Sequence, residues 1–196
     1  MDIETVGNAD DLDSVLHLTW EVLPQLAGGG PEAKYSREFW IQRMGEVPEL
    51  LLYARDGGFI CGSVFGWVEN GTVTIGHCWV DSRSRGKGVG RALMLEAERR
   101  ARDLGCRGVA LGAVASAEGF YARLGYTGTL LVQSEEHSTE ELLTLNTRYR
   151  VLYTNVYDGT VNQVCLQLPS GDRELQQEYE KAFPGCSTQM VFGKES

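Results

Sequence analysis

The sequence predicts a mixed α/β fold, in which helices flank a mostly antiparallel central sheet. Two turn signals, Asp56-Gly57-Gly58 and Asn70-Gly71, separate three segments with the composition of strands. These segments are residues 49–55, 59–69 and 72–80. The third segment leads into a glycine-rich turn, a helical pattern and further alternating strands and helices, an order typical of a sheet with helices on its faces.

The N-terminal part of the chain is predicted to contain one strand and two helices. Residues 3–6 have the composition of a strand, and Asn8 precedes apolar residues at helical spacing that continue to Leu23. Residues 28–31, Gly-Gly-Gly-Pro, interrupt this helix. A second, shorter helix is expected over residues 35–44.

The helix after the central strand has a clear apolar stripe. Apolar residues between Val89 and Leu104 recur at a spacing close to 3.6, and Gly105 stands where a left-handed helix cap is expected. A further strand is predicted over residues 108–112.

Three glycines, Gly86, Gly88 and Gly90, lie between the central strand and this helix. Without a Cβ, they let backbone N–H groups approach a ligand at the positive end of the helix dipole. Positive charge is added there by Arg85, Lys87 and Arg91. The pattern indicates a site for a phosphate-bearing ligand.

Two common phosphate-binding motifs do not fit this turn. A P-loop requires Ser or Thr after its Gly-Lys pair, and here Gly88 follows Lys87. A dinucleotide-binding fingerprint requires a carboxylate at the end of the next strand, and residues 108–112 are followed by Ala113.

What remains is the pattern Arg-x-x-Gly-x-Gly, filled by Arg85, Gly88 and Gly90. It resembles the acyl-coenzyme A pyrophosphate loop of the GNAT superfamily of N-acetyltransferases. Residues 113–126 resemble the second signature of that family, in which an aromatic residue followed by tyrosine precedes a glycine followed by another aromatic residue. Here these are Phe120-Tyr121 and Gly125-Tyr126. The chain departs from the family at Val114, where relatives often have Asn.

The resemblance implies acetyl-CoA as the acyl-donor substrate, with no metal. It assigns donor binding to the end of the strand, the turn and the start of the helix: Cys78, Val80, Ser82, Arg85, Gly86, Lys87, Gly88, Val89, Gly90 and Arg91. Tyr121 matches the family tyrosine that acts as general acid toward the departing thiolate. A phenol with a pKa of about 10 is suited to that role.

The general base is left open. Alternation along the strand predicts Thr74, Gly76, Cys78 and Val80 on one face, and His77 with Trp79 on the other. Relatives place Glu or His where Thr74 and Gly76 stand. His77, Glu69, a water-mediated route and an amine that arrives neutral are the alternatives.

The resemblance also implies that the N-terminal helices wall the acceptor site. Aromatic candidates for that wall are Trp20, Tyr35, Phe39 and Trp40. Packing in the core is the other interpretation, because aromatic residues at helical spacing usually pack.

Two domains are expected: residues 1–135 as the GNAT-like core and residues 136–196 as a C-terminal extension. A capping box at Ser138 opens a helix to Asn146, strands follow on either side of Asp158-Gly159, and a helix over 170–183 precedes a last strand. The extension either completes the core sheet with one strand or forms its own small α+β unit. It could cover the acceptor site or form a dimer interface.

Composition limits the other classes of function. The 196 residues carry a net charge of −9, but residues 85–107 hold seven bases and three acids. This balance argues against a nucleic-acid partner and fits an amine acceptor. The sequence has no apolar run long enough for a membrane span and no signal-peptide pattern, and its five cysteines lack Cys-x-x-Cys spacing. A cytoplasmic location is expected.

We therefore expect an acetyl-CoA-dependent N-acetyltransferase that moves the acetyl group to a primary amine by direct attack in a ternary complex. The acceptor would be a small amine or an exposed amino group, and a homodimer is allowed. The alternatives are a non-catalytic acyl-CoA-binding sensor and an interaction module.

Overall fold

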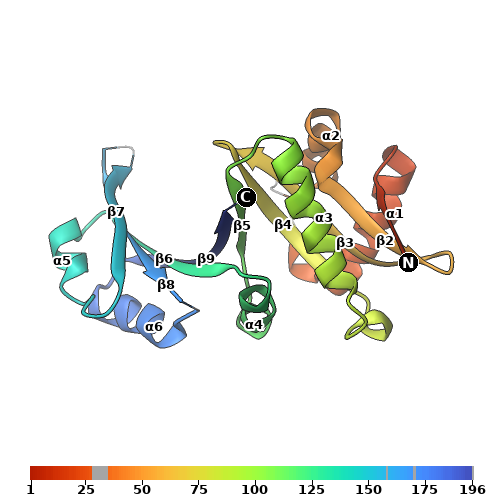
Figure 1. Cartoon of the computed structure of the whole chain (residues 1–196). Helices are drawn as coiled ribbons and strands as arrows, with labels where there is room; N and C mark the ends of the chain where they lie inside the picture. Colours follow the sequence, from red (N-terminus) through yellow and green to blue (C-terminus); the bar gives the residue numbers. More distant parts are fainter. Residues whose placement is uncertain (28–34, 158, 170, 196) are drawn as a thin grey trace. The chain divides into compact units, whose positions relative to one another are not determined.

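The structure, a computed structural model, describes residues 1–27, 35–157, 159–169 and 171–195. The chain divides into two compact units, which are described separately. Unit 1 comprises Met1–Val109 with the last residues of the chain, and unit 2 comprises Ala110–Lys194 (Figure 1). The predicted break at residues 28–31, Asp158 of the tail turn and Ser170 lie outside the described residues.

Unit 1 contains four consecutive antiparallel strands; the last three were predicted as an antiparallel set, and the first was predicted as a strand without a pairing partner. They are β1 (Asp2–Thr5), β2 (Leu51–Asp56), β3 (Phe59–Glu69) and β4 (Thr72–Val80). Asn70 and Gly71 both have positive φ, of 51° and 74°, so the β3–β4 turn has the conformation that favours this dipeptide. β2 begins two residues later than expected, because Pro48–Leu50 form a 3-10 turn.

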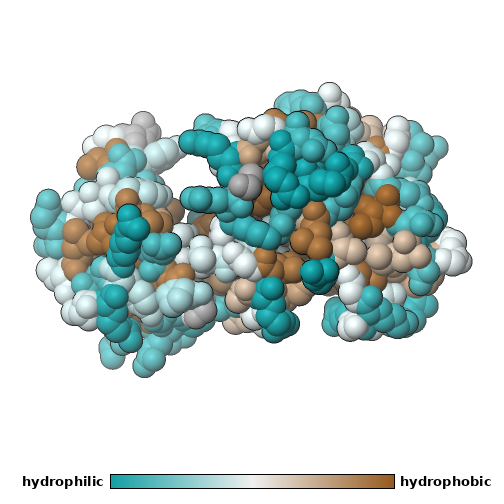
Figure 2. All heavy atoms as spheres, in the orientation of Figure 1, coloured by the Kyte–Doolittle hydropathy of each residue, from teal (hydrophilic) through white to brown (hydrophobic). Residues whose placement is uncertain are grey.

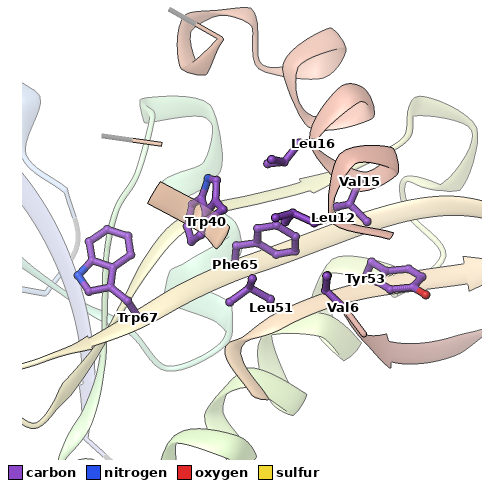
Figure 3. Close-up of a cluster of buried hydrophobic side chains, with 9 residues drawn as sticks. All are labelled: Val6, Leu12, Val15, Leu16, Trp40, Leu51, Tyr53, Phe65 and Trp67. Atoms are coloured by element: carbon purple, nitrogen blue, oxygen red, sulfur yellow. The ribbon is translucent and has the colours of Figure 1, made fainter. Parts of the chain in front are cut away.

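Two helices pack on one face of this sheet, α1 (Ala9–Val22) and α2 (Arg37–Glu46). Asn8 and Ser36 cap them by accepting hydrogen bonds from backbone N–H groups inside the first turn. Figure 3 shows the apolar core between these helices and the strands, made of Val6, Leu12, Val15, Leu16, Trp40, Leu51, Tyr53, Phe65 and Trp67. Tyr35 lies before α2, contrary to the expected helix start, because its φ is 73°.

The helix α3 (Val89–Asp103) packs on the opposite face of the sheet. A Cβ at Gly62 of β3 would lie 3.3 Å from Val89 and 3.2 Å from Leu93, so the glycine lets the helix approach the strand closely. The helix ends in the predicted left-handed cap. Gly105 has a φ of 71°, its N–H bonds Arg102 O, and the N–H of Cys106 bonds Ala101 O.

The strand β5 (Gly108–Gly112) crosses from unit 1 into unit 2 and is followed by α4 (Ala115–Arg123). Unit 2 orders its strands β9-β6-β8-β7. These are β6 (Thr127–Ser134), β7 (Arg150–Tyr157), β8 (Val161–Leu168) and β9 (Ser187–Glu195). β6 therefore has a strand of the C-terminal extension on each side, and both pairs are antiparallel.

Two helices complete unit 2, α5 (Thr139–Leu143) and α6 (Arg173–Ala182). The capping box at Ser138 is present: its side chain accepts from Glu141 N, and the Glu141 side chain accepts from Ser138 N. α5 ends before the expected Asn146, whose side chain instead bonds the backbone of Tyr149 in a turn. Among the described residues, no helix combines the length and the apolar character needed to cross a membrane.

Candidate functional site: a basic turn at the start of a helix

The turn before α3 leaves the start of that helix open. Gly86 and Gly88 have φ values of 75° and 85°, a left-handed conformation that side chains other than glycine rarely adopt. Gly88 is the N-cap, and within the part of the chain that the structure describes no side chain caps this helix. The first N–H groups of a helix have no acceptor inside it. They are therefore free to meet an anion at the positive end of the helix dipole.

The space around these glycines is open. A Cβ at Gly86 or Gly88 would meet no described atom within 4 Å. The glycines are thus required by the backbone conformation and not by crowding, and the surface beside the turn has room for a ligand. Val89 is buried and fixes the helix to the sheet, while Ser82, Arg85, Lys87 and Arg91 are exposed.

Positive charge remains available at this turn. Arg85 donates from Nε to the Val80 carbonyl oxygen, at 3.2 Å, and is exposed. The acidic neighbour Asp81 is held by Arg83, whose Nε lies 2.9 Å from its Oδ1. This hydrogen bond lowers the pKa of Asp81, so that carboxylate stays ionised and paired with Arg83.

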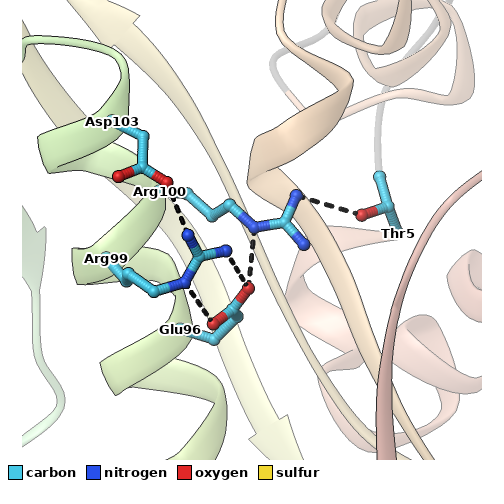
Figure 4. A network of polar contacts seen from close by, with 5 residues as sticks. All are labelled: Thr5, Glu96, Arg99, Arg100 and Asp103. Carbon is cyan, nitrogen blue, oxygen red and sulfur yellow. Dashed lines mark hydrogen bonds and ion pairs between the residues drawn. The ribbon is translucent and has the colours of Figure 1, made fainter.

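Other arginines of α3 are engaged further along the helix, in a network that reaches Thr5 of β1 (Figure 4). Glu96 pairs with both Arg99 and Arg100, at 2.7 Å in each case, and Arg99 also pairs with Asp103. Hydrogen bonds from Arg99 in the first place, then Arg100, lower the pKa of Glu96 to about 2. The basic stretch of the sequence therefore divides into a paired part near the helix end and an exposed part at the turn.

A bulge in β4 changes which side chains share a face. Phe65 pairs with His77, whereas Gly66 pairs with Ile75, so Gly76 is an extra residue on β4. Such an extra residue reverses the alternation of side chains beyond it. The prediction was therefore wrong for Thr74 and Gly76, which lie on the face of His77, but correct in placing His77 on the face opposite Cys78 and Val80.

The bulge separates Cys78 and Val80 from Thr74. Thr74 pairs with Trp67 and His77 pairs with Phe65, both members of the core under α1 and α2. Cys78 pairs with the next residue along β3, Val64, and so lies on the α3 face. The proposed donor-binding residues of β4 are on the same face as α3, and His77 is on the face of the N-terminal helices. Burial raises the pKa of the Cys78 thiol to about 12, which keeps it protonated.

His77 is buried and neutral. Its Nε2 lies 3.0 Å from Ser63 Oγ, and its ring centroid lies 4.7 Å from that of Phe65 and 5.6 Å from that of Trp40. Burial lowers its pKa from 6.5 to about 3. A group with so low a pKa is a poor acceptor of a proton from an amine near pH 7. Ser63, the partner of His77, was missed by the sequence analysis.

Three of the four predicted wall residues meet in one aromatic cluster: Tyr35, Phe39 and Trp40, joined by Trp67. Trp40 is fully buried and belongs to the core, whereas Tyr35 and Phe39 are half-buried. The fourth, Trp20, packs against the core. Trp67 was not predicted. An isolated glycine inside a strand, such as Gly76, is the sequence signal of the bulge beside it.

Tyr121 lies in α4 of unit 2 and is buried. Its ring centroid lies 5.0 Å from that of Phe120, 5.8 Å from Tyr126 and 6.4 Å from Phe192. Its role as general acid stays a prediction.

Val114, the departure from the family pattern, is exposed at the N-cap of α4. Among the described residues, no three His, Cys, Asp or Glu side chains are grouped so that they could hold a metal ion.

Comparisons with known proteins agree with this fold. A model of the acetyltransferase (GNAT) family matches residues 12–126. No curated protein sequence matches the chain significantly.

Solved structures with similar folds include several N-acetyltransferases. A PaiA N-acetyltransferase from Thermoplasma acidophilum, in complex with coenzyme A, is 18% identical with a TM-score of 0.52 over 85% of this chain and 99% of that one. A ribosomal-protein-alanine N-acetyltransferase from Brucella melitensis is 15% identical, with a TM-score of 0.51; the match covers 85% of this chain and 98% of the other. An aminoglycoside 6'-N-acetyltransferase complexed with coenzyme A is 16% identical, with a TM-score of 0.53; the match covers 85% of this chain and 96% of the other.

At these identities the structures establish the fold, a mixed and mostly antiparallel sheet flanked by helices. The family model extends over more than half of the chain, from α1 through the basic turn to the end of the second signature. This chain therefore belongs to the acetyltransferase (GNAT) family and is an acyltransferase.

Proposed function

We propose that this acyltransferase moves an acetyl group from acetyl-CoA to a primary amine by direct attack in a ternary complex. The observation that carries the proposal is the open turn at the start of α3. Two left-handed glycines, a helix start that no described side chain caps, and exposed basic side chains converge there. This is the arrangement that a pyrophosphate requires.

The residues at the turn fit coenzyme A. Backbone N–H groups of residues 86–91 and the charges of Arg85, Lys87 and Arg91 would hold its pyrophosphate. Cys78 and Val80, on the α3 face of β4, and Ser82 would contact the rest of the donor. When bound, acetyl-CoA supplies an acetyl group activated as a thioester.

Protein groups are then needed for the protons. We assign Tyr121 as the donor to the departing sulfur, which leaves as the new carbon–nitrogen bond forms. The low pKa of His77 argues against it as the base. Glu69, exposed at the end of β3, a water-mediated route or an amine that enters neutral are the remaining choices.

The family and the acidic surface support an amine as the acceptor. Two proteins with similar folds are described as an aminoglycoside 6'-N-acetyltransferase and a ribosomal-protein-alanine N-acetyltransferase. We propose a small amine or an exposed amino group here, in a cytoplasmic protein whose residues 1–135 form the catalytic domain.

A second candidate function is a sensor that binds acyl-CoA without turnover. It is favoured by the face of β4 that carries Thr74, Gly76 and His77, because none of these can act as a strong base near pH 7.

Calorimetric titration of two glycine variants tests the donor site. Gly88→Ala and Gly105→Ala change the two ends of α3, and both glycines have positive φ with no described atom within 4 Å of a new Cβ. Each substitution should cost about 1–2 kcal/mol of stability. We expect Gly88→Ala to weaken acetyl-CoA binding at least tenfold, and Gly105→Ala to leave the affinity unchanged.

The ligands are acetyl-CoA, desulfo-CoA and NAD. Binding of acetyl-CoA without binding of NAD is expected, and equal affinity of the two glycine variants for acetyl-CoA would refute the assignment of the turn. Release of free CoA in the presence of an amine panel then separates the enzyme from the sensor.

A further inference from the structure

The strand β7 is exposed along its whole length. All eight of its residues are exposed, on both faces of the strand. Five of them are large and apolar, with between 38% and 61% of their surface accessible: Val151, Leu152, Tyr153, Val156 and Tyr157. Figure 2 shows apolar surface in this part of unit 2. A strand that exposes five apolar or aromatic side chains to water is unusual in a monomer.

β7 is also an edge strand. It follows β8 at the end of the strand order and pairs with β8 alone among the described strands. Half of its backbone N–H and C=O groups therefore point away from the sheet. Natural edges are usually protected by Pro, by charged side chains or by β-bulges. β7 contains no Pro and a single charged residue, Arg150 at its start, and its register shifts between Val151 and Tyr153.

We propose that β7 pairs in antiparallel fashion with β7 of a second copy of this chain. The register shift leaves Tyr153–Tyr157 as the regular part of the strand. A two-fold axis at Asn155 would place Tyr153 opposite Tyr157 of the second copy, an aromatic pair that stabilises antiparallel sheets. Because the axis relates the two copies, this pair forms twice.

The charges of the strand favour a second copy in this orientation. Arg150 is the single charged residue of β7. Parallel pairing would place the two Arg150 side chains next to each other, whereas the antiparallel arrangement separates them by on the order of 30 Å. The antiparallel arrangement also limits the assembly to two copies. Each copy contributes the same edge, β7, to the interface, so no β7 edge remains for a third copy.

The area available sets the size of the interface. The five apolar side chains expose on the order of 500 Å² in each copy, so two copies bury at most about 1,000 Å² of apolar surface, which is the size of a small, weak interface. Outward backbone groups would gain partners in the same step. The pairing does not depend on the acetyl transfer proposed above.

Sedimentation analysis of the full chain tests this pairing. Val156→Lys places a charge on the exposed edge, and Val68→Lys places the same charge on β3, where Val68 is 38% exposed. We expect the unchanged chain and Val68→Lys to be dimers, and Val156→Lys to dissociate at least tenfold more readily. A monomeric unchanged chain, or a dimer equally stable in both variants, would overturn the proposal.

Crosslinking provides a test that does not rely on weakening the protein. Asn155→Cys would bring two thiols together at the axis, and oxidation should yield a disulfide-linked dimer that disappears on reduction. Val68→Cys is the control and should remain uncrosslinked. If Asn155→Cys formed no dimer, or joined a different polypeptide, a second copy would not be the occupant of β7.

Discussion

A methyl group at position 76 would lie 2.9 Å from ring atoms of Tyr35, Trp40 and Trp67. Gly76 is not one of the described glycines with a positive φ, so its backbone conformation does not require glycine. Glycine is required there because a larger side chain would collide with the three rings. The missing side chain lets three rings pack directly against β4 at the bulge. One residue thus joins two features, the reversed alternation of the strand and the aromatic wall.

Gly76→Ala should therefore destabilise the fold by about 1–3 kcal/mol, the usual cost of overpacking. Urea denaturation measures this as a lower midpoint with an unchanged slope. Gly45→Ala is a matched control, because Gly45 lies in α2 with no described atom within 4 Å of a new Cβ. There the change should stabilise by about 0.5–1 kcal/mol, since alanine favours a helix. The same sign at both positions would contradict this account.

His77 makes stability depend on pH. Its pKa is about 3 in the folded chain and near 6.5 when unfolded. The unfolded chain binds more protons between these values, so stability is complete above about pH 6.5 and is lost as the pH falls toward 3. His77→Gln should flatten this dependence between pH 4 and 6.5, by up to about 1.4 kcal/mol per pH unit. Denaturation at several pH values gives the slope.

The control for this measurement is His17→Gln. The His17 side chain is 75% exposed and pairs with Glu21 at 3.2 Å, one turn along α1. Its replacement should leave the slope almost unchanged. Equal slopes for the unchanged chain and His77→Gln would mean that His77 is not held neutral by burial.

At the scale of elements, α6 of the C-terminal extension is tied to α4. Arg173 donates from Nε to Glu118 Oε1 and from Nη2 to the Ala113 carbonyl oxygen, both at 2.8 Å. Gly171 makes room for the Glu118 carboxylate, because its Cβ would lie 2.0 Å from Oε2. The extension thus holds the first turn of the helix that carries Tyr121.

Arg173→Ala should remove this restraint and cost about 1–2 kcal/mol, less than a fully buried charged pair, because Arg173 is partly exposed. Hydrogen exchange over residues 115–123 should become faster. Arg148→Ala is the comparison, since Arg148 is 57% exposed and lies 3.8 Å from Asp172. Unchanged exchange in Arg173→Ala would show that α4 holds its place without the extension.

The sequence was most informative where structure is local. The Asn70-Gly71 turn, the Gly105 cap and the Ser138 capping box are determined by a few neighbouring residues, and all three were confirmed. The bulge was not predicted: the isolated Gly76 is a signal for one, but only the pairing with β3 shows that Gly76 is the extra residue. The position of β6 between β8 and β9 likewise depends on pairing between residues far apart.

The same distinction applies to the candidate site. The turn from Arg85 to Arg91 is one continuous segment, so its residue types were sufficient to indicate a phosphate-bearing ligand. Ser63 and Trp67 come from a different strand, and only the fold brings them to His77 and to the aromatic cluster.

For the whole molecule, the distribution of charge matters more than its sum. The chain carries −9, which repels an anionic ligand at long range, while the bases at the turn attract it at close range. Counterions screen charges separated by more than about 8 Å at physiological salt. Under the proposed function, the local attraction would therefore govern binding of the acyl donor, and the acidic remainder of the surface would favour a cationic acceptor.

No side chain among the described residues caps the start of α3, and this has a thermodynamic consequence. A phosphate at the turn would act as the missing cap, so the free energy of binding would add to that of folding. By linkage, a ligand at a hundred times its dissociation constant raises the stability of a protein by about 2.7 kcal/mol. The melting temperature of this chain would then rise with the concentration of its acyl donor, and its lifetime in a cell would report how much donor is present.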